Sequence, residues 1–164
     1  MGCIMDIGQI STASTVSAPT RITLRQVALF FVVVGLLVSG YLSYVKLTDV
    51  PMICVADGPF NCSVVQNSAY SKLFGIPIAW MGFAAYILLG ALLLLENRSQ
   101  FLVEQGHLIT FGVTLFAWVY SMWLVYVQFF VLEALCPWCL AHEANITVLL
   151  VIISTRLVQN LRAH

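Results

Sequence analysis

Two cysteines, Cys136 and Cys139, form the sequence C-P-W-C, whose residue types and spacing are typical of redox chemistry. In a C-x-x-C motif the pKa of one thiol is often lowered, and the pair can form a reversible disulfide. Pro137 suits the first position of a helix. A helix that begins there would place unpaired amide groups and the positive end of its dipole beside Cys136, and so would stabilise the attacking thiolate. The motif predicts disulfide exchange, with a structural pair as the alternative.

A second pair, Cys54 and Cys62, flanks turn residues at 57–59. A disulfide between these cysteines would close a small loop, and such a bond taken alone more often stabilises a loop than performs chemistry. If the pair lies at the same membrane face as the C-P-W-C pair, catalysis is favoured, because exchange requires only that one thiolate reach one sulfur of the other disulfide. The fifth cysteine, Cys3, is predicted to be an inert free thiol.

Two ionisable residues, His142 and Glu143, follow Cys139 within about one helical turn. Ionisable groups inside an apolar span are costly and usually mark a functional path. They could handle protons for a quinone, whose reduction takes up two protons with two electrons, or could hydrogen-bond a quinone carbonyl. The alternative is that both are interfacial residues near a helix start. A zinc site would need a fourth donor besides Cys136, Cys139 and His142, so no metal is predicted.

The elements that position these residues are predicted from composition. The chain has 164 residues, of which 61% are hydrophobic and 9% charged, against about 45–50% and 25% in soluble domains. A helix that crosses the hydrocarbon core of a bilayer needs about 20 mostly apolar residues. Four such runs predict an all-α integral membrane protein, a bundle of four transmembrane helices spanning about 26–45, 74–95, 108–131 and 135–155.

The orientation of the bundle is predicted from Lys and Arg, which collect in cytoplasmic loops. One side would carry Arg21, Arg25, Arg98, Arg156 and Arg162, and the other only Lys46 and Lys72. The chain is therefore divided into a cytoplasmic tail at 1–24, a membrane domain at 25–158 with an outer loop at 46–73, and a second cytoplasmic tail at 159–164. Both cysteine pairs then lie at the outer face, where disulfides persist.

A short helix is expected in the outer loop directly after Cys62. Ser63 to Gln66 has the S-x-x-Q form of a capping box, which predicts a helix from about Val64 to Lys72. This helix would act as a lid over the outer ends of the spans and would hold Cys62 near Cys136. Ser68 by itself is an ordinary polar residue of that helix.

The order of these motifs resembles the vitamin K epoxide reductase (VKOR) family over most of residues 27–156. The loop pair is followed by Ser63 and Ser68, then by the sequence F-G-I-P, and C-P-W-C opens the last span. The DsbB type of quinone-coupled thiol oxidase has the opposite order, with its C-x-x-C in the first outer loop. The resemblance thus depends on the order of the cysteines along the chain.

The resemblance implies an electron path. A partner thiol reduces the Cys54 and Cys62 disulfide, Cys62 exchanges with Cys136, and Cys139 faces a quinone of the ubiquinone, menaquinone or phylloquinone type. Ser68 matches a family serine implicated in the loop chemistry. Glu143 departs from the family, since several relatives have tyrosine or another neutral group there. The partner is expected to be a separate thioredoxin-fold protein, since no such domain follows the fourth span.

The favoured function is a thiol:quinone oxidoreductase that reoxidises its thioredoxin-like partner and supports disulfide bond formation, in contact with membrane lipid and without a nucleic acid partner. The lack of a retention signal at Arg162 to His164 favours a bacterial or archaeal inner membrane. One alternative is a vitamin K epoxide or quinone reductase of the endoplasmic reticulum. Others are a non-catalytic membrane subunit with structural disulfides and a metal-handling membrane protein.

Overall fold

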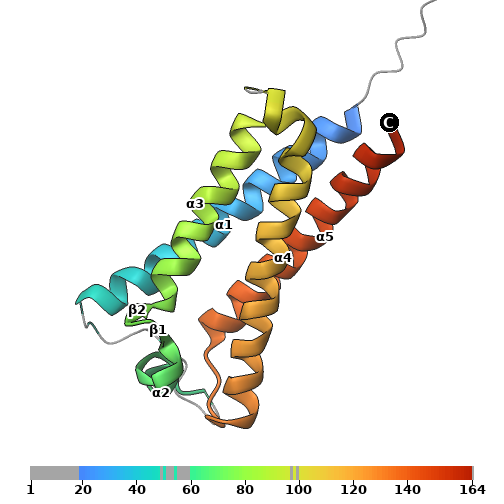
Figure 1. Ribbon diagram of the computed structural model, residues 1–164. Helices are drawn as coiled ribbons and strands as arrows, with labels where there is room; N and C mark the ends of the chain where they lie inside the picture. The colour runs from blue at the N-terminus through green and yellow to red at the C-terminus, as the bar shows by residue number, and fades with distance from the viewer. Residues whose placement is uncertain are drawn as a thin grey trace, which may run out of the picture.

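Four long helices form a bundle in the computed structural model, which describes residues 19–48, 50, 54, 60–96, 98 and 100–163 (Figure 1). Within these residues, four helices are long and apolar enough to cross a membrane. The predicted all-α fold with four spanning helices is confirmed. The long helices are α1 (Pro19–Thr48), α3 (Ile78–Leu95), α4 (Gln100–Phe130) and α5 (Pro137–Ala163).

The helices α1, α3 and α5 meet in the main core of the bundle. α1 packs against α3 and α5, and α4 packs mainly against α5. Gly35 on α1 is required where Tyr86 of α3 crosses the core, because a Cβ at Gly35 would overlap the Tyr86 ring. Large apolar side chains such as Leu37 and Phe116 are 70% and 74% exposed. Such a surface suits lipid, whose acyl chains solvate apolar groups.

A short lid helix, α2 (Cys62–Asn67), crosses one end of the bundle and confirms the predicted lid. Its predicted bounds are wrong. The side chain of Asn61 caps the helix by accepting the Val64 N–H at 3.2 Å, so the helix begins before the Ser63 capping box. Ser68 has an extended backbone, with ψ at 158°, and ends the helix well before Lys72.

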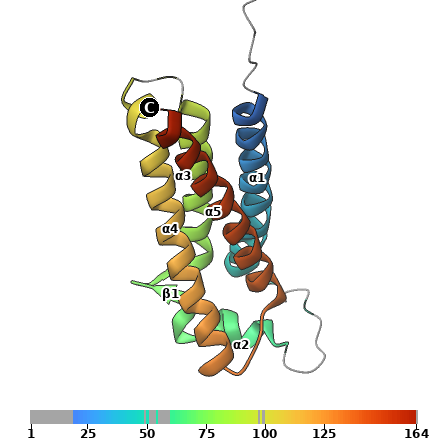
Figure 2. The ribbon, with the colours of Figure 1, turned by 90° about the vertical axis from the view of Figure 1, so that its right-hand side faces the viewer.

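A 3₁₀ turn, η1 (Ala69–Ser71), and a hairpin of β1 (Lys72–Leu73) and β2 (Ile76–Pro77) join α2 to α3. Phe74 and Gly75 form the turn of this hairpin, and both have positive φ, at 52° and 85°. A two-residue turn of this kind matches the twist of the strands. Figure 2 shows the hairpin projecting sideways from the bundle.

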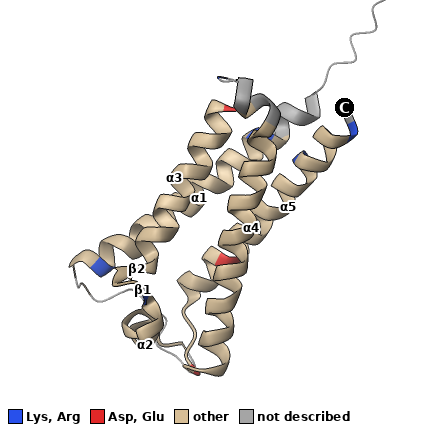
Figure 3. Ribbon diagram, viewed as in Figure 1, with Lys and Arg blue, Asp and Glu red and all other residues tan. Residues whose placement is uncertain are grey.

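Charged residues lie mainly at the two ends of the bundle (Figure 3). At the end where α3 finishes, the carboxylate of Glu96 lies 2.8 Å from Arg156 and 2.8 Å from His107. Arg25 donates to two backbone oxygens in the last turn of α3, at 3.0 and 3.3 Å. Side chains from α1, α4 and α5 therefore all bind the C-terminal end of α3 by hydrogen bonds or ion pairs.

The Glu96 cluster predicts a loss of stability in acid. Burial alone would raise the pKa of Glu96, but the bonds from His107 and Arg156 lower it to about 2 from the ordinary 4.5. The depressed pKa stabilises the folded state above pH 4.5, and this stabilisation is lost as the pH falls toward 2. We expect Glu96→Gln to lower the free energy of unfolding at pH 7 by about 1–3 kcal/mol.

Thermal unfolding in detergent between pH 7 and pH 2 checks this prediction. Glu96→Gln cannot titrate at this position, so its Tm should fall less across the acid window than the wild-type Tm does. Equal falls in the two proteins would contradict the role assigned to Glu96.

Candidate redox site

Both cysteine pairs lie at the end of the bundle where α2 meets the start of α5, called here the cysteine end. Cys54 and Cys62 form a disulfide with their Cα atoms 6.3 Å apart. Cys136 and Cys139 are free thiols. Cys62 and Cys136 belong to one buried apolar cluster, and the other two cysteines pack against it. The structure therefore brings together all four cysteines that the sequence singles out.

Backbone pairing sets the approach of the loop to α5. Phe60 and Leu135 form a parallel β-bridge. The Asn61 N–H donates to the Leu135 backbone oxygen at 3.0 Å. Cys62 and Cys136 come directly after these paired residues, and they are only 2% and 0% exposed. The bridge thus places the second loop cysteine beside the first C-P-W-C cysteine.

Cys136 lies directly before the N-terminus of α5. The helix begins at Pro137, as the C-P-W-C motif predicts. A hydrogen bond with the Cys139 thiol lowers the pKa of Cys136, burial raises it, and bonds from the backbone N–H groups of Cys139 and Trp138 lower it further. The balance lowers the Cys136 pKa to about 7 from the ordinary 9.0. A large fraction of Cys136 can therefore be thiolate near neutral pH.

Gln128, on the last turn of α4, holds the segment that leads into the motif. Its side chain is 4% exposed, and its Oε1 accepts the Cys136 N–H at 3.1 Å. Its backbone oxygen accepts the Ala134 N–H at 3.2 Å. Gln128 was not among the residues predicted from the sequence. It could have been identified as an amide side chain near the end of a long apolar run. Burying an amide in apolar surroundings costs free energy unless it is hydrogen-bonded.

We expect Gln128→Met to slow exchange between the cysteine pairs by about tenfold, because the buried Cys136 N–H loses its acceptor and the segment shifts. Gln105→Met on the same helix is the matched control, since Gln105 is exposed. Rapid-quench alkylation after mixing with a reduced dithiol measures the exchange rate. An unchanged rate in Gln128→Met would show that Gln128 does not position Cys136.

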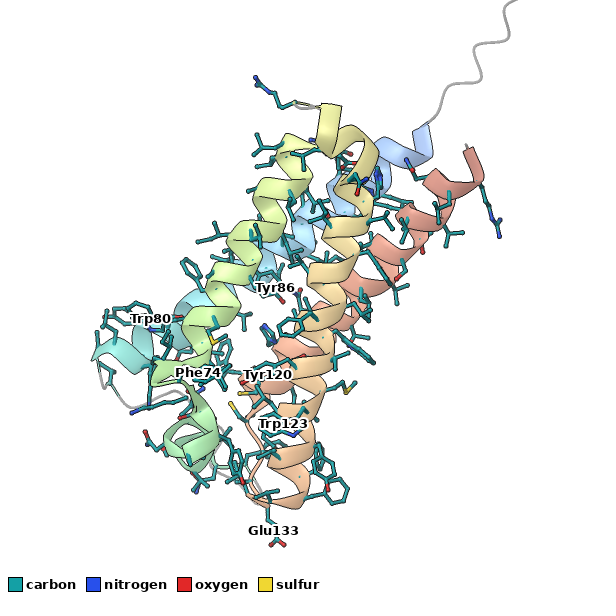
Figure 4. All side chains as sticks on the ribbon, in the orientation of Figure 1. Phe74, Trp80, Tyr86, Tyr120, Trp123 and Glu133 are labelled. Atoms are coloured by element: carbon teal, nitrogen blue, oxygen red, sulfur yellow. A yellow bond between two sulfur atoms is a disulfide. The ribbon has the colours of Figure 1, made fainter. Side chains whose placement is uncertain are left out.

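A cavity of about 250 Å³ lies between α3, α4 and α5 beneath the lid. Its lining is mostly apolar, and Cys139, His142 and Glu143 are among the exceptions on α5. Tyr120 also lines it, and Figure 4 shows this ring between α3 and α4. Cavities of this kind, apolar with a few convergent polar groups, are typical of small-molecule sites.

Glu143 is buried inside the bundle, with only 8% of its surface exposed. The Ser121 hydroxyl donates to one of its carboxylate oxygens, and the Thr147 hydroxyl donates to the other at 3.4 Å. The Trp118 indole N–H donates to Thr147 at 2.9 Å. Residues on α4 and α5 thus orient the carboxylate, and none of these partners could be identified from the sequence.

His142 and Ser68 contact the cavity from different elements. The His142 ring packs edge-on against Tyr86, with the ring centres 5.5 Å apart. Gly82 of α3 lies beside this ring, and a Cβ there would be in ordinary van der Waals contact with His142 Nε2, at 3.7 Å. Ser68 lines the cavity at the end of the lid, and its hydroxyl donates to the Val65 backbone oxygen at 2.8 Å.

The described residues contain no group of three or more His, Cys, Asp or Glu side chains that could hold a metal ion. Cys136, Cys139 and His142, the three candidate zinc ligands, lie within the described residues.

The model of the vitamin K epoxide reductase family matches residues 26–154. Thiol-disulfide oxidoreductase LTO1 of Arabidopsis thaliana is 34% identical over 80 residues, which cover 46% of this chain and 21% of that relative. The aligned stretch is thus about a fifth of the relative's length. Because the family match extends over all four long helices and both cysteine pairs, the chain belongs to the vitamin K epoxide reductase family.

Proposed function

We propose that this chain is a membrane thiol:quinone oxidoreductase that reoxidises a thioredoxin-fold donor and passes two electrons to a membrane quinone. The observation that carries the proposal is the placement of the cysteines. Cys139 lines the apolar cavity, whereas Cys62, the first residue of the lid, is buried with Cys136 in one cluster. The four cysteines therefore suit a relay from a donor at the loop to a flat, apolar acceptor in the cavity.

The first step of the relay is reduction of the loop. The dithiol of the donor reduces the Cys54–Cys62 disulfide and becomes a disulfide itself. The Cys62 thiolate then attacks Cys136 in the oxidised C-P-W-C pair, forms a mixed disulfide and releases Cys139 as a thiolate. Cys54 attacks Cys62, restores the loop disulfide and releases Cys136. The lowered pKa of Cys136 supports this order, because a thiol of low pKa is a good leaving group.

The second step transfers the electrons. The Cys136 and Cys139 dithiol gives two electrons to the quinone and becomes a disulfide, while the two carbonyl oxygens of the quinone gain two protons. This transfer starts from a disulfide in the loop and free thiols at Cys136 and Cys139, which is the pairing of the cysteines in the structure. Glu143 and His142, which line the cavity with Cys139, are the groups best placed to supply protons.

The cysteine end would face the outside of the cell or the lumen, and both termini would face the cytoplasm. The excess of Lys and Arg at the opposite side supports this orientation. Labelling of Cys139 in a Cys3→Ser and Cys136→Ser background with a membrane-impermeant maleimide, in intact cells and in inverted vesicles, tests it. Labelling only in inverted vesicles would reverse the orientation.

The purified protein, a reduced thioredoxin-fold donor and a series of quinones test the function directly. We expect quinol formation that is stoichiometric with oxidation of the donor, at two electrons for each quinone. Vitamin K epoxide in place of the quinone tests whether the cavity also accepts an epoxide. A protein that reduces no quinone, with disulfides that resist mild reductant, would instead be a subunit with structural disulfides.

A further inference from the structure

Lys46, near the end of α1, is bonded to the last turn of the lid helix α2. Its Nζ donates to the backbone oxygen of Gln66 at 3.0 Å and to the side-chain oxygen of Asn67 at 3.0 Å. The two acceptors are the last residues of α2. Lys46 of α1 therefore holds one end of the lid by hydrogen bonds.

The lid is held independently at its other end. There the Asn61 N–H donates to Leu135 at 3.0 Å, and Cys62 is bonded to Cys54. A helix of six residues is too short to be stable alone. Its position therefore depends on these attachments, one toward the start of α5 and one toward α1.

The lid contacts both parts of the redox site. On its buried side, Cys62 and Val65 pack in the cluster that contains Cys136. Val65, Gln66 and Ser68 line the cavity. Movement of the Gln66 end would therefore turn Cys62 away from Cys136 and would also open the cavity to water.

We propose that Lys46 is a latch that holds the lid helix over the cysteine cluster and the cavity, and is a positioning residue for exchange between Cys62 and Cys136. This inference rests on the proposed relay. It predicts two effects of opposite sign when the latch is removed. Donor-driven electron transfer becomes slower, and the partly buried Cys139 thiol beneath the lid becomes more accessible to water-soluble reagents.

The first readout is quinone reduction driven by the protein donor. We expect Lys46→Met to lower kcat about tenfold, because the hydrogen bonds of a charged donor are lost and the lid is released. Lys46→Arg, which can reach the same two oxygens, should restore most of the rate. Lys72→Met is the matched control, since Lys72 is an exposed lysine of β1 at the same end of the bundle.

The second readout needs no quinone. In a Cys3→Ser and Cys136→Ser background, Cys139 is left as a single thiol in the cavity and the loop disulfide is retained. A charged maleimide approaches from water, and the lid residues Val65, Gln66 and Ser68 line the cavity that also contains Cys139. We expect Lys46→Met to accelerate this alkylation about tenfold, because local opening governs the reactivity of buried groups. Asn67→Ala, which removes one of the two acceptors, should give an intermediate rate.

Glu96→Gln separates opening of the lid from general loss of stability, because it weakens the opposite end of the bundle. It should leave alkylation of Cys139 near the wild-type rate.

Slower turnover together with faster alkylation in Lys46→Met, both reversed in Lys46→Arg, would support the latch. Alkylation that is unchanged in Lys46→Met, or equally fast in Glu96→Gln, would overturn it. A wild-type protein inactive with every quinone would instead refute the proposed function, while the alkylation rates would still decide the latch.

Discussion

Cys139→Ser is expected to abolish quinone reduction, with a loss of at least about a thousandfold in kcat, because the thiol that faces the acceptor is removed. The donor should still reduce the loop disulfide in this variant, since Cys54 and Cys62 are unchanged. Quinol formation and the redox state of the donor, followed in the same sample, separate the two steps. Quinone reduction at the wild-type rate in Cys139→Ser would refute the relay.

Cys54→Ser provides a complementary test of the order of the cysteines. Without Cys54, the mixed disulfide between Cys62 and Cys136 cannot be resolved by the loop, so it should accumulate. Mass spectrometry of peptides from non-reduced protein detects that bond. Cys3→Ser, which lies outside the described residues, is the control and should retain full turnover. Accumulation of a Cys62 bond to Cys139 instead would reverse the assigned roles of the C-P-W-C cysteines.

Glu143→Gln is expected to lower quinone reduction by about a hundredfold, because an amide fills the same space but cannot donate a proton as an acid. Exchange between the loop and the C-P-W-C pair should continue, since Glu143 lies on the cavity side of Cys139. Ser121→Ala should have a smaller effect of about tenfold, because it frees one carboxylate oxygen but keeps the acid. Stopped-flow measurement of quinol formation from prereduced protein isolates this step.

Glu133→Gln is the matched control for Glu143→Gln. Glu133 is exposed, and Figure 4 shows it pointing away from the bundle at the cysteine end. Its substitution makes the same change from carboxyl to amide without touching the cavity. A Glu143→Gln variant with wild-type kcat and a raised KM would assign Glu143 to binding of the quinone carbonyl rather than to proton transfer.

The cysteine pairs illustrate which parts of the site can be predicted from sequence. The start of α5 at Pro137 depends on residues adjacent in the chain, so the C-P-W-C motif predicts it correctly. The capping of the lid is also local, yet the prediction chose Ser63 over Asn61. Both residue types are good N-caps, and the cap lies at Asn61, whose N–H pairs with Leu135, a residue remote in sequence.

The sequence by itself determined the four-helix membrane architecture and the identity of the cysteines, because long apolar runs and C-x-x-C spacing are local properties of the chain. Only the tertiary structure assigned Gln128 to the Cys136 amide, Lys46 to the lid and Ser121 to Glu143. Each of these contacts joins different segments of the chain. Their partners depend on how the helices pack, and the hydropathy that creates the helices does not specify which polar side chains meet.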